Sequence, residues 1–178
     1  MSRSGSGGRM RAEFVRTARL ELVPLEAGHA GEMAEALADP ALHEFIGGAP
    51  LGAARLRERY ARLAGGSPDP EVSWCNWVLR TRERPCRLVG TVQATVTAGG
   101  SVAEVAWVVG TAWQGRGFAS EAARGLVGLL ERRGVGLVLA HIHPEHRASA
   151  AVARAAGLAP TDERADGEVV WRLALGGR

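Results

Sequence analysis

The sequence predicts a single α+β domain with a mixed, mostly antiparallel sheet and helices on both faces. Segments with the period-two alternation of strands are interleaved with segments that have the 3.6-residue period of amphipathic helices. Three strand-like segments also follow one another in the middle of the chain, separated only by short turns, which is typical of antiparallel neighbours. The length of 178 residues fits one domain, and we find no internal repeat and no long linker.

Each element is predicted from its own pattern. Alternation predicts a strand over residues 14–23, which Pro24 ends. Later strands are predicted over residues 72–81, 87–97, 102–109, 135–142 and 168–175. Helices are predicted between residue 25 and Pro40, and over residues 52–63, 120–133 and 148–156. The segment 135–142 is a continuous apolar run, so we expect that strand to be buried on both faces.

The N-terminal segment, residues 1–12, is rich in Ser, Gly and Arg and lacks the apolar middle of a secretory signal. We expect it to be a disordered leader, with Met10 as an alternative start, ahead of a domain over residues 13–178. Cys75 and Cys86 form neither a disulfide framework nor a zinc ligand set, which favours a reducing compartment. No run reaches the length of a membrane span. We therefore expect a cytoplasmic protein with no membrane partner.

The charge pattern excludes several classes of protein. All 22 basic residues are arginine, so chemistry that needs a lysine, such as a pyridoxal Schiff base or a phosphate-binding loop lysine, is ruled out. The net charge is only +3 and the arginines are scattered, so no basic stripe for nucleic acid is visible. A small anionic ligand is compatible with this balance.

The loop Trp113-Gln114-Gly115-Arg116-Gly117 connects a predicted strand to a predicted helix. Backbone N–H groups and the positive end of the helix dipole make such a loop suitable for phosphate or pyrophosphate. Glycine at two positions permits close approach of the backbone, and Arg116 can add a charge-assisted contact. The alternative is a tight turn with nothing bound. A Rossmann site is disfavoured, because the loop follows three antiparallel-type strands rather than the first strand of a βαβ unit.

Two sequence blocks resemble the GNAT superfamily of N-acetyltransferases. Gln114-x-x-Gly117-x-Ala119, followed by Glu121-Ala122, is similar to the acetyl-CoA signature of that superfamily, and HPEHRASAAVARAAGL is similar to its second block. The chain from about residue 13 fits the family layout and is closest to the ribosomal-protein N-terminal (RimJ/RimL-like) branch, whose first strand has the R-L-x-L pattern that begins here at Arg19. The resemblance implies a GNAT-type sheet and an acetyl-CoA cosubstrate.

The resemblance also implies where CoA binds. The pyrophosphate would lie on the glycine loop and the following helix start, formed by Gln114, Gly115, Arg116, Gly117, Phe118, Ala119 and Ser120. The pantetheine arm would pair with the strand backbone at Trp107, Val108 and Val109, between two strands that splay apart. A backbone N–H near Val109 would stabilise the oxyanion. His146 stands where the family has asparagine and would contact pantetheine, and Ser149 would lie beside it.

The same resemblance implies direct attack of an amine on the thioester, which requires removal of a proton. Glu104 is our candidate for the general base, with a position on the solvated face of the strand as the alternative. Glu44 and Glu168 are lesser candidates. Ser149 is the candidate proton donor to the CoA thiolate, although its hydroxyl could instead bond to its own helix. The tyrosine that many family members use is replaced by Ala153.

Further expectations concern metal, acceptor and assembly. His141, His143 and His146 invite a metal site, but we predict none, because no set of partner carboxylates accompanies them. The acceptor, a small molecule or a protein N-terminus, would bind mainly among residues 25–65 and the hairpin loops, where His43, Glu44 and Phe45 are candidates. Monomer and homodimer both stay open. A CoA-binding or regulatory module without catalysis, and a nucleotide-binding enzyme of another fold, are the competing interpretations.

Overall fold

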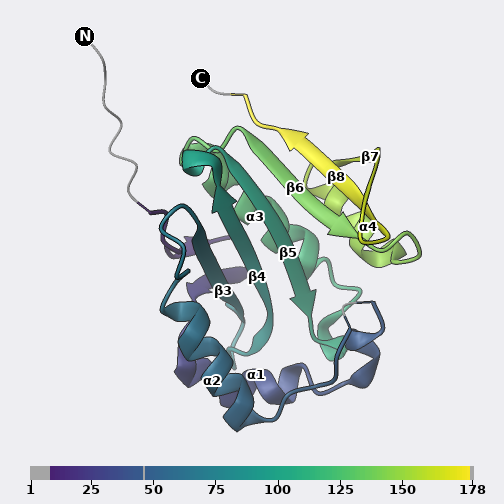
Figure 1. The fold of residues 1–178 in the computed structure, drawn as a ribbon. Coiled ribbons are helices and arrows are strands. Elements are labelled where there is room, and N and C mark those ends of the chain that lie inside the picture. Colours follow the sequence, from purple (N-terminus) through teal and green to yellow (C-terminus); the bar gives the residue numbers. More distant parts are fainter. Residues whose placement is uncertain (1–8, 46, 177–178) are drawn as a thin grey trace.

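Eight strands form one sheet in the computed structural model, which describes residues 9–45 and 47–176 (Figure 1). Their spatial order is β1 (Val15–Arg16), β2 (Leu20–Pro24), β3 (Ser73–Thr81), β4 (Leu88–Thr97), β5 (Val102–Val109), β6 (Leu137–Ile142), β8 (Glu168–Ala174) and β7 (Ala159–Ala165). Every neighbouring pair is antiparallel except β5 and β6, which are parallel. The predicted α+β class with a mixed, mostly antiparallel sheet is confirmed.

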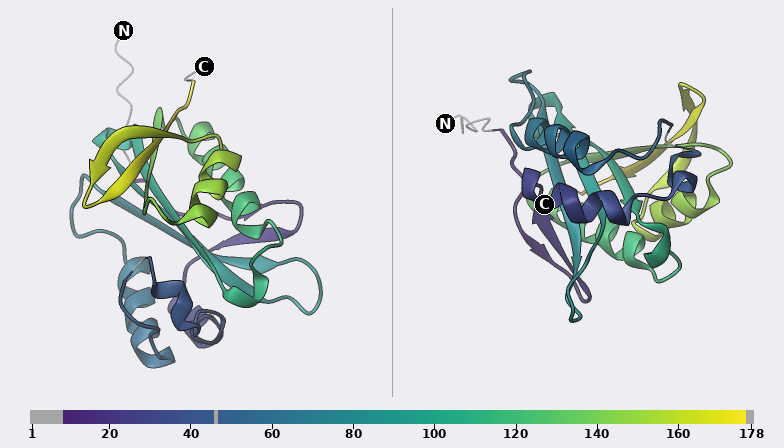
Figure 2. Two further views of the ribbon diagram at one scale, coloured as in Figure 1. Left: turned by 90° about the vertical axis from the view of Figure 1, so that its right-hand side faces the viewer. Right: turned by 90° about the horizontal axis from the view of Figure 1, so that it is seen from below.

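Helices cover both faces of this sheet (Figure 2). On one face, α1 (Ala30–Ala36) and α2 (Ala53–Ala64) pack against each other and against β4 and β3. On the other face lie α3 (Phe118–Arg132), which connects the two parallel strands, and α4 (Arg147–Ala155). Single 3-10 turns precede several elements, including η2 (Pro40–His43) and η4 (Thr111–Trp113).

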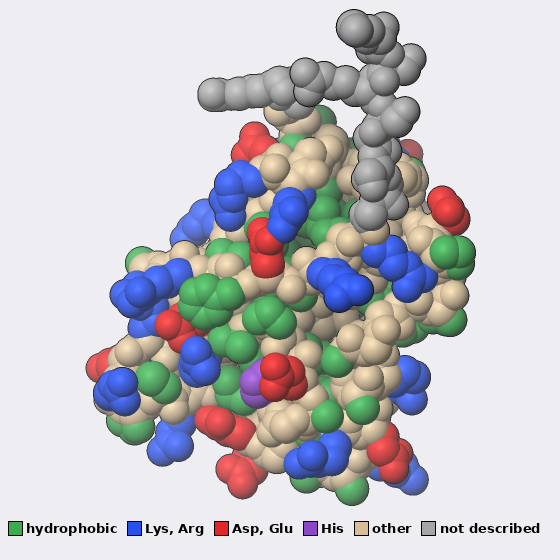
Figure 3. Space-filling view, turned by 90° about the vertical axis from the view of Figure 1, so that its left-hand side faces the viewer, with side chains coloured by type: hydrophobic (Ala, Val, Ile, Leu, Met, Phe, Trp, Pro, Cys, Tyr) green, Lys and Arg blue, Asp and Glu red, His purple; other side chains and the backbone are tan. Residues whose placement is uncertain are grey.

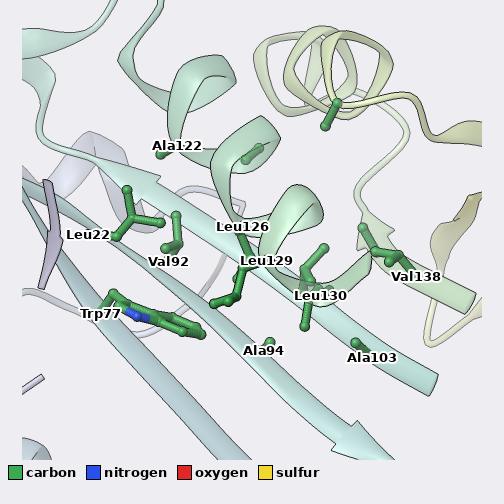
Figure 4. Close-up of a cluster of buried hydrophobic side chains, with 14 of the residues drawn as sticks. Leu22, Trp77, Val92, Ala94, Ala103, Ala122, Leu126, Leu129, Leu130 and Val138 are labelled. Carbon is green, nitrogen blue, oxygen red and sulfur yellow. The ribbon is translucent and has the colours of Figure 1, made fainter. Parts of the chain in front are cut away.

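Strand alternation divides the core into two clusters. In β3, Trp77 belongs to the cluster under α3, whereas Val78 belongs to the cluster under α1 and α2. Leu126 and Leu130 of α3 belong to the same cluster as Trp77 and lie on the sheet side of that helix (Figure 4). The Trp77 indole N–H donates to the Glu13 carbonyl at 2.8 Å, so the polar edge of this buried ring is satisfied.

Two predicted elements differ from the structure, and one strand was not predicted. The first strand is broken into β1 and β2, because the chain bends where Thr17 N–H donates to the Leu20 carbonyl. The apolar run of β6 is not buried on both faces: its residues alternate between buried and half-buried, since α3 and α4 cover only one side. Strand β7 was not predicted. Its sequence, APTDERA, is mostly exposed and polar and carries no alternation of apolar side chains.

Of the expected leader, residues 1–12, the structure describes only residues 9–12. Residues 9–12 run beside β3: Met10 N–H donates to the Ser73 hydroxyl at 3.0 Å, and the Cys75 thiol lies 3.5 Å from the Met10 carbonyl. Burial raises the pKa of the Cys75 thiol to about 11. Residues 9–12, the described part of the expected leader, thus lie along β3.

The surface of Figure 3 has arginine side chains spread among acidic and hydrophobic ones rather than gathered into a stripe. Within residues 9–45 and 47–176, no helix is both long enough and apolar enough to cross a membrane.

Candidate active site

The parallel strands β5 and β6 separate along their length and open a cleft. They are paired at Val102 with Leu137, at Ala103 with Val138 and at Glu104 with Leu139. Beyond this point β5 stays paired with β4 as far as Val109, while β6 diverges from it, as Figure 1 shows. The cleft has a volume of about 610 Å³ and lies between the second half of β5, the end of β6, the start of α3 and α4. The edge of β5 that faces β6 thus presents backbone groups without a strand neighbour there.

The glycine loop closes one end of the cleft. Gly115 and Gly117 have φ angles of +77° and +79°, a region that disfavours residues with a Cβ, and Gly117 is the N-cap of α3. No side chain caps that helix, so the first N–H groups of α3 are free to meet a ligand. A Cβ added at Gly115 would meet nothing within 4 Å. The positive φ angle, rather than crowding by the protein, therefore explains glycine at this position.

A carboxylate from α3 fixes the loop to the bend between β1 and β2. Glu121 accepts hydrogen bonds from Thr17 Oγ1 at 2.6 Å, Arg19 N at 2.6 Å and Arg19 Nε at 2.8 Å. Arg19 also donates to the Arg116 carbonyl and lies over the Phe118 ring. Burial raises the pKa of Glu121, but the hydrogen bonds from Thr17 and Arg19 and the arginine charge outweigh it, so the net pKa is lowered.

The residues that the resemblance assigns to CoA are brought together here. Those that line the cleft are Trp107, Val108, Val109, Gln114, Gly115, Gly117, Phe118, Ala119, Ser120, His146 and Ser149. Arg116 is exposed and is not among them. The Gln114 side chain donates to the Val109 carbonyl at 3.0 Å, so it ties the loop to the end of β5.

The opposite wall comes from α4 and the segment after η2. His146 stacks on Phe45 with ring centroids 4.4 Å apart, and its Nε2 lies 3.4 Å from the Ser149 hydroxyl. Burial, followed by the nearby His143, lowers the pKa of His146, and Glu44 opposes this. Ala153 is fully buried in the core, whereas Val152 lines the cleft. The side chain at position 153 therefore points away from the cleft.

Glu104 lies at the point where β5 and β6 part. Its Oε1 is 2.9 Å from Nδ1 of His141, which follows two residues after the register partner of Glu104 on β6. His141 lines the cleft and its side chain is 27% exposed, whereas the Glu104 side chain is 53% exposed and is not a lining residue. Glu168 of β8 also lines the cleft, and Glu44 does not.

A second cavity of about 450 Å³ adjoins the first on the side of α1 and α2. Four residues line both cavities: Leu42, Ala106, Trp107 and Val108. His43 lines the second cavity and Phe45 the first, so two of the three acceptor candidates border the connected space. Among the residues that the structure describes, no group of three or more His, Cys, Asp or Glu side chains is arranged to hold a metal ion.

Comparison with known proteins identifies the family. A family profile described as an acetyltransferase (GNAT) domain matches residues 19–159. The chain belongs to the GNAT family of acetyltransferases. A GNAT protein is an acyl-transferring enzyme, so the prediction of an N-acetyltransferase is confirmed at this level. A search of curated protein sequences found no significant match.

Solved GNAT structures share the fold at low sequence identity. A GNAT-family acetyltransferase from Bacillus anthracis is 17% identical with a TM-score of 0.75, over 91% of this chain and 98% of that one. RimL, a ribosomal L7/L12 alpha-N-protein acetyltransferase solved with coenzyme A, is 15% identical with a TM-score of 0.73, over 92% and 98% of the two chains. A Salmonella typhimurium enzyme that modifies the N-terminal serine of ribosomal protein L7/L12 is 15% identical with a TM-score of 0.74, over 92% and 100%.

Two features of this GNAT site were not predicted as such. Arg19 was noted only as part of the first-strand pattern, yet it holds the start of α3 through Glu121. His141 was considered only as a metal ligand, yet it pairs with Glu104 inside the cleft. Both contacts join residues far apart in the chain, so no local signal could have revealed them.

Proposed function

We propose that this chain transfers the acetyl group of acetyl-CoA directly to a primary amine in a ternary complex, without a covalent enzyme intermediate. The observation that carries the proposal is a cleft between parting strands that ends at an uncapped helix start with two glycines at positive φ. RimL, which shares the fold, is described as bound to coenzyme A. The microcin C7 self-immunity acetyltransferase MccE, which is 12% identical with a TM-score of 0.69, is described as bound to acetyl-CoA and AMP.

The residues present fit acetyl-CoA, which supplies an activated thioester carbonyl when bound. The N–H groups of the glycine loop and of the first turn of α3 would bind the pyrophosphate, since anions are stabilised at helix N-termini. The free edge of β5 at Trp107, Val108 and Val109 would bind the pantetheine amides as a short added strand. His146 and Ser149 would contact the arm from α4.

The acceptor would enter from the second cavity, because that cavity meets the cleft along β5. A backbone N–H near Val109 would stabilise the oxyanion that forms during attack. The Ser149 hydroxyl is the proposed hydrogen-bond donor to the departing sulfur, and the Glu104 end of the cleft is the proposed site of amine deprotonation.

Binding and turnover test the proposal separately. Isothermal titration calorimetry should detect binding of acetyl-CoA, and removal of the pantetheine arm, with ADP as the probe, should weaken it strongly. Thiol release should then be followed with an amine panel: a peptide with N-terminal serine, leucinamide, 2-phenylethylamine, spermidine and kanamycin. We expect release that depends on at least one amine.

Other results would point elsewhere. Tight CoA binding without turnover of any amine would favour a CoA-binding or regulatory module. Equal affinity for ADP and acetyl-CoA would instead favour a nucleotide site and contradict the proposed use of the β5 edge.

A further inference from the structure

We propose that His141 accepts the proton of the attacking amine, and that Glu104 positions the His141 imidazole rather than acting as the base itself. The inference rests on the proposed function and assigns the proton transfer within it. It makes His141 a catalytic residue and Glu104 a positioning residue.

The geometry of the parting strands separates the two side chains. Glu104 is the last residue of β5 that is paired with β6, so it sits at the closed end of the cleft. His141 lies two residues farther along β6 than Leu139, the partner of Glu104, where the strands have already diverged. The imidazole therefore lines the cleft, while the carboxylate stays behind it and faces solvent.

The hydrogen bond fixes the chemical state of the imidazole. A carboxylate only accepts, so Nδ1 of His141 is the donor to Glu104 Oε1 across 2.9 Å. The neutral ring then carries its free lone pair on Nε2, the nitrogen that Glu104 does not engage. A carboxylate behind an imidazole also stabilises the protonated ring after it has accepted a proton.

Other charged groups surround the pair. On β8, Val170 is the register partner of His141, and Glu168 and Arg172 lie two residues to either side. Arg172 is paired with Glu163 at 2.7 Å. On β4, the partner of Glu104 is the uncharged Thr95. Past the end of β6, His143 Nδ1 accepts from Glu145 N–H, and Glu44 interacts electrostatically with His146.

The proposed step balances without a further reactant. The amine nitrogen attacks the thioester carbonyl carbon, a C–N bond forms, and one N–H proton passes to Nε2 of His141. The C–S bond then breaks, and its electron pair leaves with the sulfur. The thiolate is protonated from solvent, with the Ser149 hydroxyl as the hydrogen-bond donor along the way. The imidazolium returns its proton to solvent before the next cycle.

Three variants distinguish His141 from Glu104 as the base. We expect His141→Gln to lower kcat about 100-fold or more, with the affinity for acetyl-CoA unchanged in calorimetry. Glu104→Gln should lower kcat about 10-fold, because the ring keeps a partner but loses the charge. The double variant should be no slower than His141→Gln within about 3-fold, since both changes act on one group. His29→Gln and Glu163→Gln, both away from the cleft, should retain wild-type rates.

The dependence of kcat/KM on pH distinguishes a catalytic role of His141 from a purely structural one. With an imidazole as the base, kcat/KM of the wild type should rise with pH in two steps, one from the ring and one from the acceptor amine. His141→Gln should lose the first rise. Glu104→Gln should keep the first rise, because the imidazole is still present in that variant. Imidazole added to the medium should partly restore His141→Ala, and ¹⁵N NMR should find Nδ1 protonated and Nε2 free.

Several results would overturn the inference. Glu104→Gln being slower than His141→Gln would make the carboxylate the base. An unchanged rate and pH profile in His141→Gln, or an Nε2-protonated ring, would remove His141 from the reaction. These outcomes leave the proposed function intact, because amine-dependent thiol release by the wild type would continue. If the wild type acetylates no amine in the panel, both the proposed function and the assignment of His141 as the base are contradicted.

Discussion

Glu121 connects the N-terminal strands β1 and β2 to the end of the cleft at the start of α3. Its carboxylate, which is 11% exposed, accepts three hydrogen bonds from the bend between β1 and β2. Because the same residue lies in the first turn of α3, these bonds hold the start of the helix at the end of the cleft. The position of the glycine loop therefore depends on residues about 100 positions earlier, at a bend within the segment 14–23 that the sequence pattern predicted as one strand.

We predict that Glu121→Gln lowers the free energy of unfolding by about 1 kcal/mol at pH 7, as expected for partly exposed charge-assisted bonds. The pKa of Glu121 is lowered in the folded state, so the carboxylate stabilises the protein above its ordinary pKa of 4.5 in the unfolded chain. This contribution is lost as the pH falls through the folded pKa. Urea unfolding should thus show a difference from wild type at pH 7 that shrinks at pH 4 and below.

The matched control for this prediction is Glu131→Gln, which removes an exposed carboxylate from the last turn of the same helix. It should change the free energy of unfolding by less than about 0.5 kcal/mol at either pH. A Glu121→Gln difference that stayed constant with pH would mean that the side chain acts by packing rather than by its charge.

At the scale of elements, the loop between β5 and α3 is the part of the site that should respond most sharply to a single methyl group. We predict that Gly115→Ala raises the Kd of acetyl-CoA at least 10-fold, because the new Cβ points into open space that the pyrophosphate would occupy. The variant should also lose about 1 kcal/mol of stability, since alanine is strained at a φ of +77°. Calorimetry and urea unfolding measure the two effects separately.

Gly134 provides the control for this strain. It has a φ of +83°, also has open space around an added Cβ, and follows the other end of α3. Gly134→Ala should therefore lose a similar free energy of unfolding and keep the wild-type affinity for acetyl-CoA. If both variants bind acetyl-CoA equally well, the loop does not meet the pyrophosphate.

The elements that the sequence predicted well are those with local signals. Strands β3 to β5 and helix α2 were predicted to within one residue at each end, because alternation, helical spacing and Gly or Pro breaks mark them. The glycine loop between β5 and α3 was predicted for the same reason, since Gly115 and Gly117 are only two positions apart in the chain. Strand β7 and the pairing of Glu104 with His141 were not predicted, because an exposed edge strand and a register across 37 residues leave no local pattern.

At the scale of the whole molecule, the crossover through α3 makes β5 and β6 the parallel pair of the sheet, and their divergence places two cavities side by side. The first cavity reaches the uncapped start of α3, and the second lies beneath α1 and α2. The shared wall is the second half of β5. A donor and an acceptor bound in the two cavities would therefore meet along one strand, although the residues that line the cavities come from different parts of the chain.

The chemistry of the second cavity predicts which amines are good acceptors. Among its described lining residues are Leu37, Leu51, Leu56 and Tyr60, together with Arg59, and none is Asp or Glu. A polycation would lose hydration in this cavity without gaining a carboxylate partner. An amine with an apolar substituent would instead bury that substituent against the leucine side chains. We therefore predict that leucinamide and 2-phenylethylamine have kcat/KM values at least 10-fold above those of spermidine and kanamycin.

Reversing the charge at Arg59 tests this account directly. Arg59→Glu should raise kcat/KM for spermidine several-fold and change that for 2-phenylethylamine by no more than about 2-fold. The new carboxylate attracts a polycation more strongly than an apolar amine with a single charge. Arg57→Glu makes the same charge change on α2 at a residue that does not line the cavity, and it should leave the ratio of the two substrates unchanged. A wild-type preference for spermidine, or an equal response of the two variants, would mean that the acceptor does not bind in this cavity.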